Sequence, residues 1–159
     1  MKRPHHHQQG VATVEFAIIG MVAMVALFAV FEIGRAFFVF NALEEATRRG
    51  SRVAVVCEVN DAAIAEIAVF NASGGGASSP LVAGLTTGNV QVSYLDDAGA
   101  VIGDPLGNYG QIAYVRVRIV NFQHQLLIPL FTRTFTMPQF STVLPRESLG
   151  VSREGVTPC

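Results

Sequence analysis

Charged side chains are scarce in this sequence. They make up 14% of the 159 residues, the net charge is −1, and no run of basic residues is longer than Arg48–Arg49. The chain therefore offers no basic surface for nucleic acid. The HExxH, CxxC, GxSxG and Walker patterns are also missing, so we expect a protein that is not an enzyme and binds no cofactor.

Residues with the spacing of metal ligands are missing as well. His5, His6 and His7 lie in a short polar leader, Met1–Gly10, and His124 stands alone. A lone histidine is more often a structural residue than a ligand. The sequence therefore predicts no metal site.

The segment Val11–Phe31 contains only one charged residue, Glu15. About 20 apolar residues in a helix cross a hydrocarbon layer of about 30 Å. A chain of this size can hardly bury such a helix on all sides. No Ala-x-Ala signal cleavage site occurs between Val11 and Ala46. These features favour a transmembrane helix over a buried core helix or a cleaved secretory signal.

The flanks of this segment predict its orientation. Lys2 and Arg3 precede it and no acidic residue occurs among the first ten, which favours a cytoplasmic N-terminus. The arginines that follow the helix argue the other way, although Glu32, Glu44 and Glu45 partly balance them. We expect a leader at residues 1–10, a transmembrane helix at 11–31 and a periplasmic domain at 32–159.

Glu15 is the most informative residue in the apolar segment. A carboxylate within a membrane costs about 2.5–3.5 kcal/mol at the centre of a helix and less near an end. If the chain is cut after Gly10, a new α-amine appears at Val11, one helical turn before Glu15. In a bundle of such helices, Glu15 of one subunit can neutralise the amine of its neighbour. The alternative is that Glu15 merely extends to the lipid headgroups.

The segment Gly10-Val11-Ala12-Thr13-Val14-Glu15-Phe16 resembles the prepilin cleavage site of type IV-like pilins. More closely, Val14–Ala17, Glu32–Arg35, Asn41–Leu43 and Ala46–Arg52 resemble the TadE-like family, minor pseudopilins of the tight-adherence (Tad/Flp) pilus system. Unlike many of those proteins, this chain has no proline early in its apolar segment.

The resemblance implies processing at Gly10–Val11 by a prepilin peptidase, and assembly through Glu15 and Phe16. It implies that the partners are other pilins and the Tad assembly machinery in a bacterial inner membrane, with possible incorporation into an extracellular pilus. A permanently anchored periplasmic scaffold or regulatory component of a secretion system is the alternative.

The helix is predicted to continue beyond the membrane. Small and apolar residues recur at steps of three and four, as on one helix face: Ala36, Val39, Leu43, Ala46, Gly50, Val53 and Cys57. Glu44 and Glu45 stand four residues before Arg48 and Arg49, a favourable order for helical ion pairs. No proline interrupts Val11–Val56, so we expect one helix of about 45 residues. Gly34 and Gly50 mark either a hinge or close packing.

The rest of the chain predicts a small antiparallel sheet packed on the distal half of that helix. Asn60–Asp61 offers an N-cap for a short helix at Ala62–Asn71. Strands are expected at Val90–Tyr94, Ala100–Ile102, Val115–Ile119 and Thr132–Val143, the last at an edge or bulged because it contains Pro138. Phe122–Phe131 either caps the core or forms an exposed patch. The expected fold class is α+β and pilin-like.

Two cysteines occur, Cys57 after the long helix and Cys159 at the end of the sequence. In a periplasmic domain, a disulfide between them is their simplest use, and two free thiols are the alternative.

Overall fold

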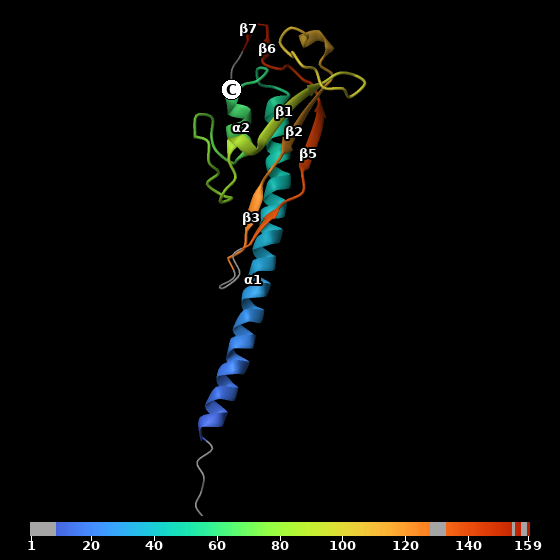
Figure 1. Cartoon of the computed structure of the whole chain (residues 1–159). Coiled ribbons are helices and arrows are strands. Elements are labelled where there is room, and N and C mark those ends of the chain that lie inside the picture. The colour runs from blue at the N-terminus through green and yellow to red at the C-terminus, as the bar shows by residue number, and fades with distance from the viewer. Residues whose placement is uncertain (1–8, 128–132, 154, 157–158) are drawn as a thin grey trace, which may run out of the picture.

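A single long helix forms the axis of the molecule. The computed structural model describes residues 9–127, 133–153, 155–156 and 159. Helix α1, Gln9–Ala54, has 46 residues and is therefore about 69 Å long. Its first half extends away from the domain and its second half lies along the sheet (Figure 1). The predicted uninterrupted helix is confirmed, with both ends two residues earlier than expected.

The domain is built from short elements on the distal half of α1. They are α2 (Ala62–Ala68), the 3₁₀ turns η1 (Thr87–Asn89) and η2 (Tyr109–Gln111), and the strands β1 (Val90–Leu95), β2 (Tyr114–Ile119), β3 (Gln123–Gln125), β4 (Thr134–Thr136), β5 (Phe140–Pro145), β6 (Val151–Ser152) and β7 (Gly155–Val156). A three-stranded antiparallel sheet has the order β1-β2-β5, and β3-β4 and β6-β7 form separate two-stranded ladders. The fold is α+β, as predicted.

Two strand predictions were wrong. The segment expected as one strand at Thr132–Val143 forms two, β4 and β5, with Pro138 between them; Thr132 itself lies outside the described residues. Proline has no backbone N–H to donate, so the ladder cannot continue through it. The segment Ala100–Ile102 turns back along the free edge of β1, where the backbone N–H of Ile102 donates to Tyr94 O at 2.9 Å, but it makes only an isolated bridge, Leu95 to Val101.

The short helix α2 begins where the sequence predicted. Asp61 is its N-cap and accepts a hydrogen bond from the backbone N–H of Ala63 at 2.9 Å, which satisfies one of the free donors of the first turn. The helix ends at Ala68, three residues before the expected end. Phe70 follows with φ of +68°, a left-handed conformation that cannot continue a helix.

The core lies between α1, α2 and the sheet. Leu43 and Ala46 of α1 and Val115 and Val117 of β2 are fully buried, with 0% exposure. Thr47 Oγ1 lies 2.8 Å from Thr142 Oγ1 of β5, so a polar pair also joins the helix to the edge strand. The predicted buried helix face is confirmed at its centre, while Ala36 and Val53 at its ends are only half-buried.

Gly50 is a point of close packing. A Cβ atom at this position would lie 2.9 Å from Cβ of Ala68 and 3.1 Å from Cγ1 of Val117. The missing side chain therefore lets α2 and β2 approach α1 together. A Cβ atom at Gly34, in contrast, would have no neighbouring atom within 4 Å.

The segment Phe122–Phe131 divides between the two predicted roles. Phe122 is 3% exposed and caps the core, whereas Leu127 is 66% exposed. Residues 128–131 lie outside the described residues.

Candidate functional site

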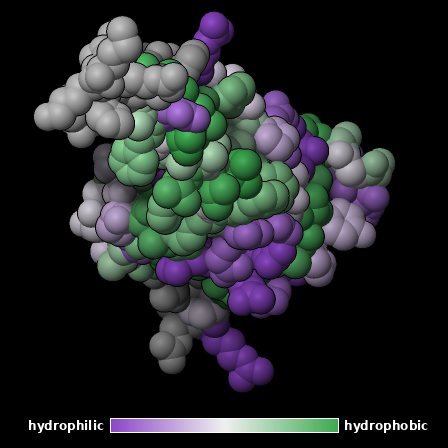
Figure 2. All heavy atoms as spheres, turned by 90° about the horizontal axis from the view of Figure 1, so that it is seen from below, coloured by the Kyte–Doolittle hydropathy of each residue, from purple (hydrophilic) through white to green (hydrophobic). Residues whose placement is uncertain are grey.

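The first half of α1 presents apolar side chains on every side. Twelve large apolar residues in this half are each more than half exposed: Val11, Val14, Phe16, Ile18, Ile19, Met21, Val22, Met24, Val25, Leu27, Val30 and Phe31. Figure 2 shows the molecule from below, from the N-terminal end of α1, and hydrophobic residues occupy the middle of this face. This helix is long and apolar enough to span a membrane once.

The residues predicted for processing and assembly lie in the first turns of this helix. Gly10 and Val11 both have helical backbone, and a Cβ at Gly10 would have no neighbour within 4 Å. Glu15 is exposed, Val11 is 71% exposed and Phe16 is 77% exposed. Because four residues make about one turn, Val11 and Glu15 lie on the same helix face. Gly10, Val11, Glu15 and Phe16 are therefore all accessible to a partner helix or a peptidase.

A buried charged cluster marks the point where the helix enters the domain. Glu32 is 8% exposed and His124 of β3 is 3% exposed, with Nε2 of the histidine 3.3 Å from Oε1 of the carboxylate. Arg35 donates to Glu32 and also to the backbone carbonyl of Gln125. The backbone N–H of Leu127 donates to Glu32 Oε2 at 3.3 Å. The cluster joins α1 to the β3-β4 hairpin.

These contacts control the ionisation of Glu32. Burial alone would raise its pKa. The hydrogen bond from Arg35, the Leu127 backbone N–H, the positive charge of Arg35 and the His124 ring together hold the pKa of Glu32 below its usual value. Glu32 is therefore a charged, well-partnered residue rather than a neutral one.

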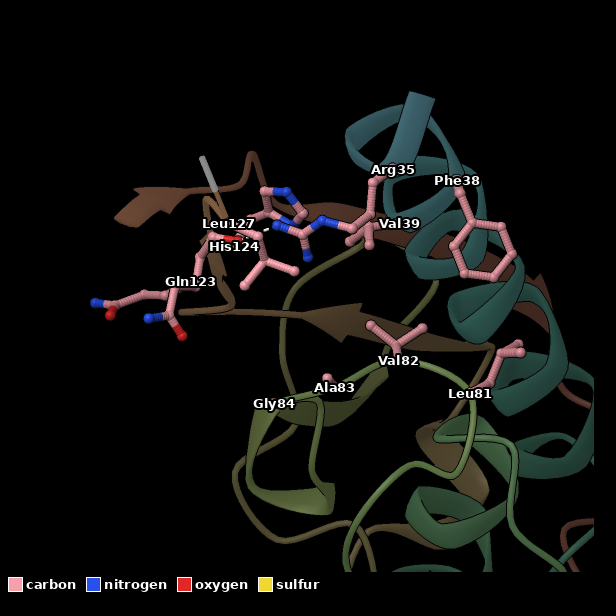
Figure 3. A pocket seen from close by; sticks show the side chains of 11 residues that line it. Arg35, Phe38, Val39, Leu81, Val82, Ala83, Gly84, Gln123, His124 and Leu127 are labelled. Atoms are coloured by element: carbon pink, nitrogen blue, oxygen red, sulfur yellow. Dashed lines mark hydrogen bonds between the residues drawn. The ribbon is translucent and has the colours of Figure 1, made fainter. Parts of the chain in front are cut away.

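A cavity of about 410 Å³ opens beside this cluster, between α1, β3 and the segment 81–84 (Figure 3). Its walls are mainly apolar and include Phe38, Val39 and Val82, while Arg35 extends across it toward Leu127 and His124. Within the described part of the chain, no group of three or more His, Cys, Asp or Glu residues could hold a metal ion.

Sequence reasoning missed this cluster, because it treated His124 as standing alone. The available signal was Glu32 and Arg35 at a spacing of three directly after the apolar segment. Which distant residue would cover them depends on how β3 lies on the helix, and short strands rich in glutamine carry little pattern.

The structure contains the predicted disulfide between Cys57 and Cys159, with Cα atoms 5.6 Å apart. The backbone N–H of Cys159 also donates to Oδ2 of Asp61 at 2.9 Å. The end of the chain is thus fixed beside the end of α1 and the start of α2.

Comparison with known protein families agrees with the helix geometry: the model of the family described as TadE-like protein matches residues 10–52. Residues 10–52 form a TadE-like domain. No curated protein and no solved structure matches the chain.

The TadE-like domain covers nearly all of α1. It begins at Gly10, includes Glu15, Glu32 and Gly50, and ends two residues before the helix does. The sheet, α2 and the disulfide lie outside the TadE-like domain.

Proposed function

We propose that this chain is a minor pseudopilin of a Tad/Flp-type pilus. In this proposal a prepilin peptidase removes residues 1–10 on the cytoplasmic side of the inner membrane. The span 11–31 then transfers from the membrane into a bundle of pilin helices, and the domain stands on the periplasmic side. The observation that carries the proposal is the TadE-like domain on a helix whose apolar first half has no cover within the described chain.

The mechanism of assembly would depend on Glu15. In a bilayer a carboxylate near the end of a span costs free energy. An α-amine produced at Val11 of a neighbouring subunit can offset that cost, because a charge pair in a low-dielectric environment needs both partners. The exposure of Glu15, Val11 and Phe16 on α1 supports this role. The same pairing would set the relative height of adjacent helices.

Processing can be tested with variants that leave the fold unchanged. Gly10→Leu and Gly20→Leu both add a side chain where no atom lies within 4 Å. When each chain is produced with a prepilin peptidase, intact mass should show a mature form starting at Val11 for the parent and for Gly20→Leu, and an uncut form for Gly10→Leu. An intact Met1 terminus in the parent chain would contradict processing and favour the permanently anchored scaffold.

Assembly needs a separate test. Glu15→Ala should abolish incorporation into pili while membrane insertion persists. Glu44→Ala makes the same chemical change in the distal half, where Glu44 pairs with Arg48 on the helix surface, and should leave piliation unchanged. If Glu15→Ala assembles like the parent, Glu15 only reaches toward the headgroups and the pairing mechanism is wrong.

A further inference from the structure

The base of the domain has its charges inside and its apolar side chains outside. At the level of residues 32–38 the ionised groups of Glu32 and Arg35 turn toward the β3-β4 hairpin and pair there. Apolar side chains at the same level are exposed: Ile33 is 58% exposed, Phe37 65%, and Phe38, which also lines the cavity beside Arg35, 51%. This arrangement is the reverse of a helix packed on a water-soluble domain.

The hairpin contributes to the same surface. Leu127 is held at the height of Glu32 by its backbone hydrogen bond, and its side chain is 66% exposed. Phe135 of β4, which pairs with His124, is 55% exposed. We call Ile33, Phe37, Phe38, Leu127 and Phe135 the basal surface.

The length of exposed apolar helix exceeds the hydrocarbon layer. From Val11 to Phe31 the helix rises by about 30 Å, which already matches that layer. Exposed apolar residues continue to Phe40, about 13 Å further along the axis. A bilayer adds an interfacial layer of about 5–8 Å on each side of its hydrocarbon. About half of the additional apolar segment therefore lies at the height of that layer.

The polar groups at this height are suited to such an environment. Glu32 accepts from a side chain and from a backbone N–H, and Arg35 donates to both Glu32 and Gln125 O. Buried ionic groups near lipid persist when they are paired within the protein. Arg133, directly before β4, is exposed. A long basic side chain at this position can reach lipid phosphates.

We propose that the basal surface is a membrane-docking surface, immersed in the headgroup layer of the bilayer that α1 spans. This inference rests on the membrane step of the proposed function and adds that the domain itself contacts lipid. The occupant is lipid rather than a protein because the exposed apolar surface is continuous with the span. In addition, the outward side chains of the hairpin are uncharged polar residues suited to the water boundary: Gln123, Gln125, Thr134 and Thr136.

The absence of tryptophan in the chain allows a direct test. Single-tryptophan variants of the full chain are reconstituted in phosphatidylcholine–phosphatidylglycerol vesicles at a low protein-to-lipid ratio. The probes are phospholipids spin-labelled at the headgroup or in the middle of the acyl chain. Phe37→Trp and Phe135→Trp report on the basal surface from two different elements. Met21→Trp reports on the centre of the span, and Leu106→Trp on a distal loop where the side chain is 62% exposed.

The expected result is strong quenching of both basal tryptophans by the headgroup label, of Met21→Trp by the acyl-chain label, and of Leu106→Trp by neither. The proposal is overturned if the basal tryptophans behave like Leu106→Trp while Met21→Trp is quenched. A blue-shifted but unquenched basal tryptophan would likewise overturn it, in favour of a protein partner. Lack of quenching at Met21→Trp would overturn the membrane span and this inference together.

Discussion

The two halves of α1 share one backbone and differ in how their apolar side chains are covered. Between Val11 and Phe31 the apolar side chains point in all directions and are exposed. From Val39 to Ala54 the apolar side chains form one buried stripe, apart from the exposed Phe40 and the half-buried Val53. The helix runs through both because its hydrogen bonds are internal and do not depend on what surrounds it. Helix formation here therefore says little about environment, and the distribution of apolar residues around the axis says a great deal.

The comparison also shows where the stability of the domain resides. Only the distal half contributes to the core with α2, β2 and β5. The same substitution should therefore lower the free energy of unfolding when it is made in the distal half and leave it nearly unchanged when it is made in the first half.

Reduction of the disulfide should have the largest effect. Cys57 and Cys159 are 102 residues apart, and closing a loop of about 100 residues is worth up to about 4.7 kcal/mol in the chain-entropy model. Denaturation with and without reductant, followed through tyrosine fluorescence, should show a lower midpoint for the reduced domain. The helicity of the first half should be unchanged. Equal midpoints would contradict a stabilising role for the bridge.

Leucine truncation should separate the two halves clearly. Leu43→Ala removes a fully buried side chain and should cost about 2–5 kcal/mol. Leu27→Ala removes a side chain that is 54% exposed in the span, so domain unfolding should change by less than about 0.5 kcal/mol. Guanidinium denaturation of both variants in the same detergent provides the measurement. Similar losses for the two would disprove the division of the helix.

Alanine in place of glycine should change stability in opposite directions. Gly50→Ala places a methyl group 2.9 Å from Ala68 Cβ. Overpacking costs about 1–3 kcal/mol, which outweighs a propensity gain of about 1 kcal/mol. Gly34→Ala meets no atom within 4 Å and should be neutral or stabilising. Thermal unfolding of the pair decides the point, and a stabilised Gly50→Ala would refute the close packing of α2 on α1.

The smallest effect should be a pH dependence at the junction of the halves. The pKa of Glu32 is lower in the folded chain than its ordinary value of 4.5. Its stabilising contribution is therefore complete above pH 4.5 and is lost as the pH falls through the lower, folded-state pKa. The difference in unfolding free energy between the parent and Glu32→Gln should shrink below pH 4.5. Glu44→Gln, on the exposed surface, is the control, and a difference independent of pH down to 3 would contradict the prediction.

The sequence predicted the parts of this molecule that depend on local pattern. The span, the stripe from Val39 to Gly50 and the Asp61 cap follow from composition, periodicity and capping chemistry. The positions of β3 and β4 did not, because a strand of three residues is too short to show the period-2 alternation that marks a strand. Glu32 could be noticed in the sequence, but its pairing with His124, 92 residues later, depends on tertiary contacts alone.

The disulfide has a mechanical consequence for a subunit moved along its own axis. A pull on the N-terminal half enters the domain through α1 and reaches Cys57. The bond to Cys159, at a sequence separation of 102, retains the intervening residues in a closed loop, a contour of about 340–370 Å when extended. If the domain unfolded under tension, the closed loop could therefore not be pulled out to that length. Cys159 would stay beside the end of the helix.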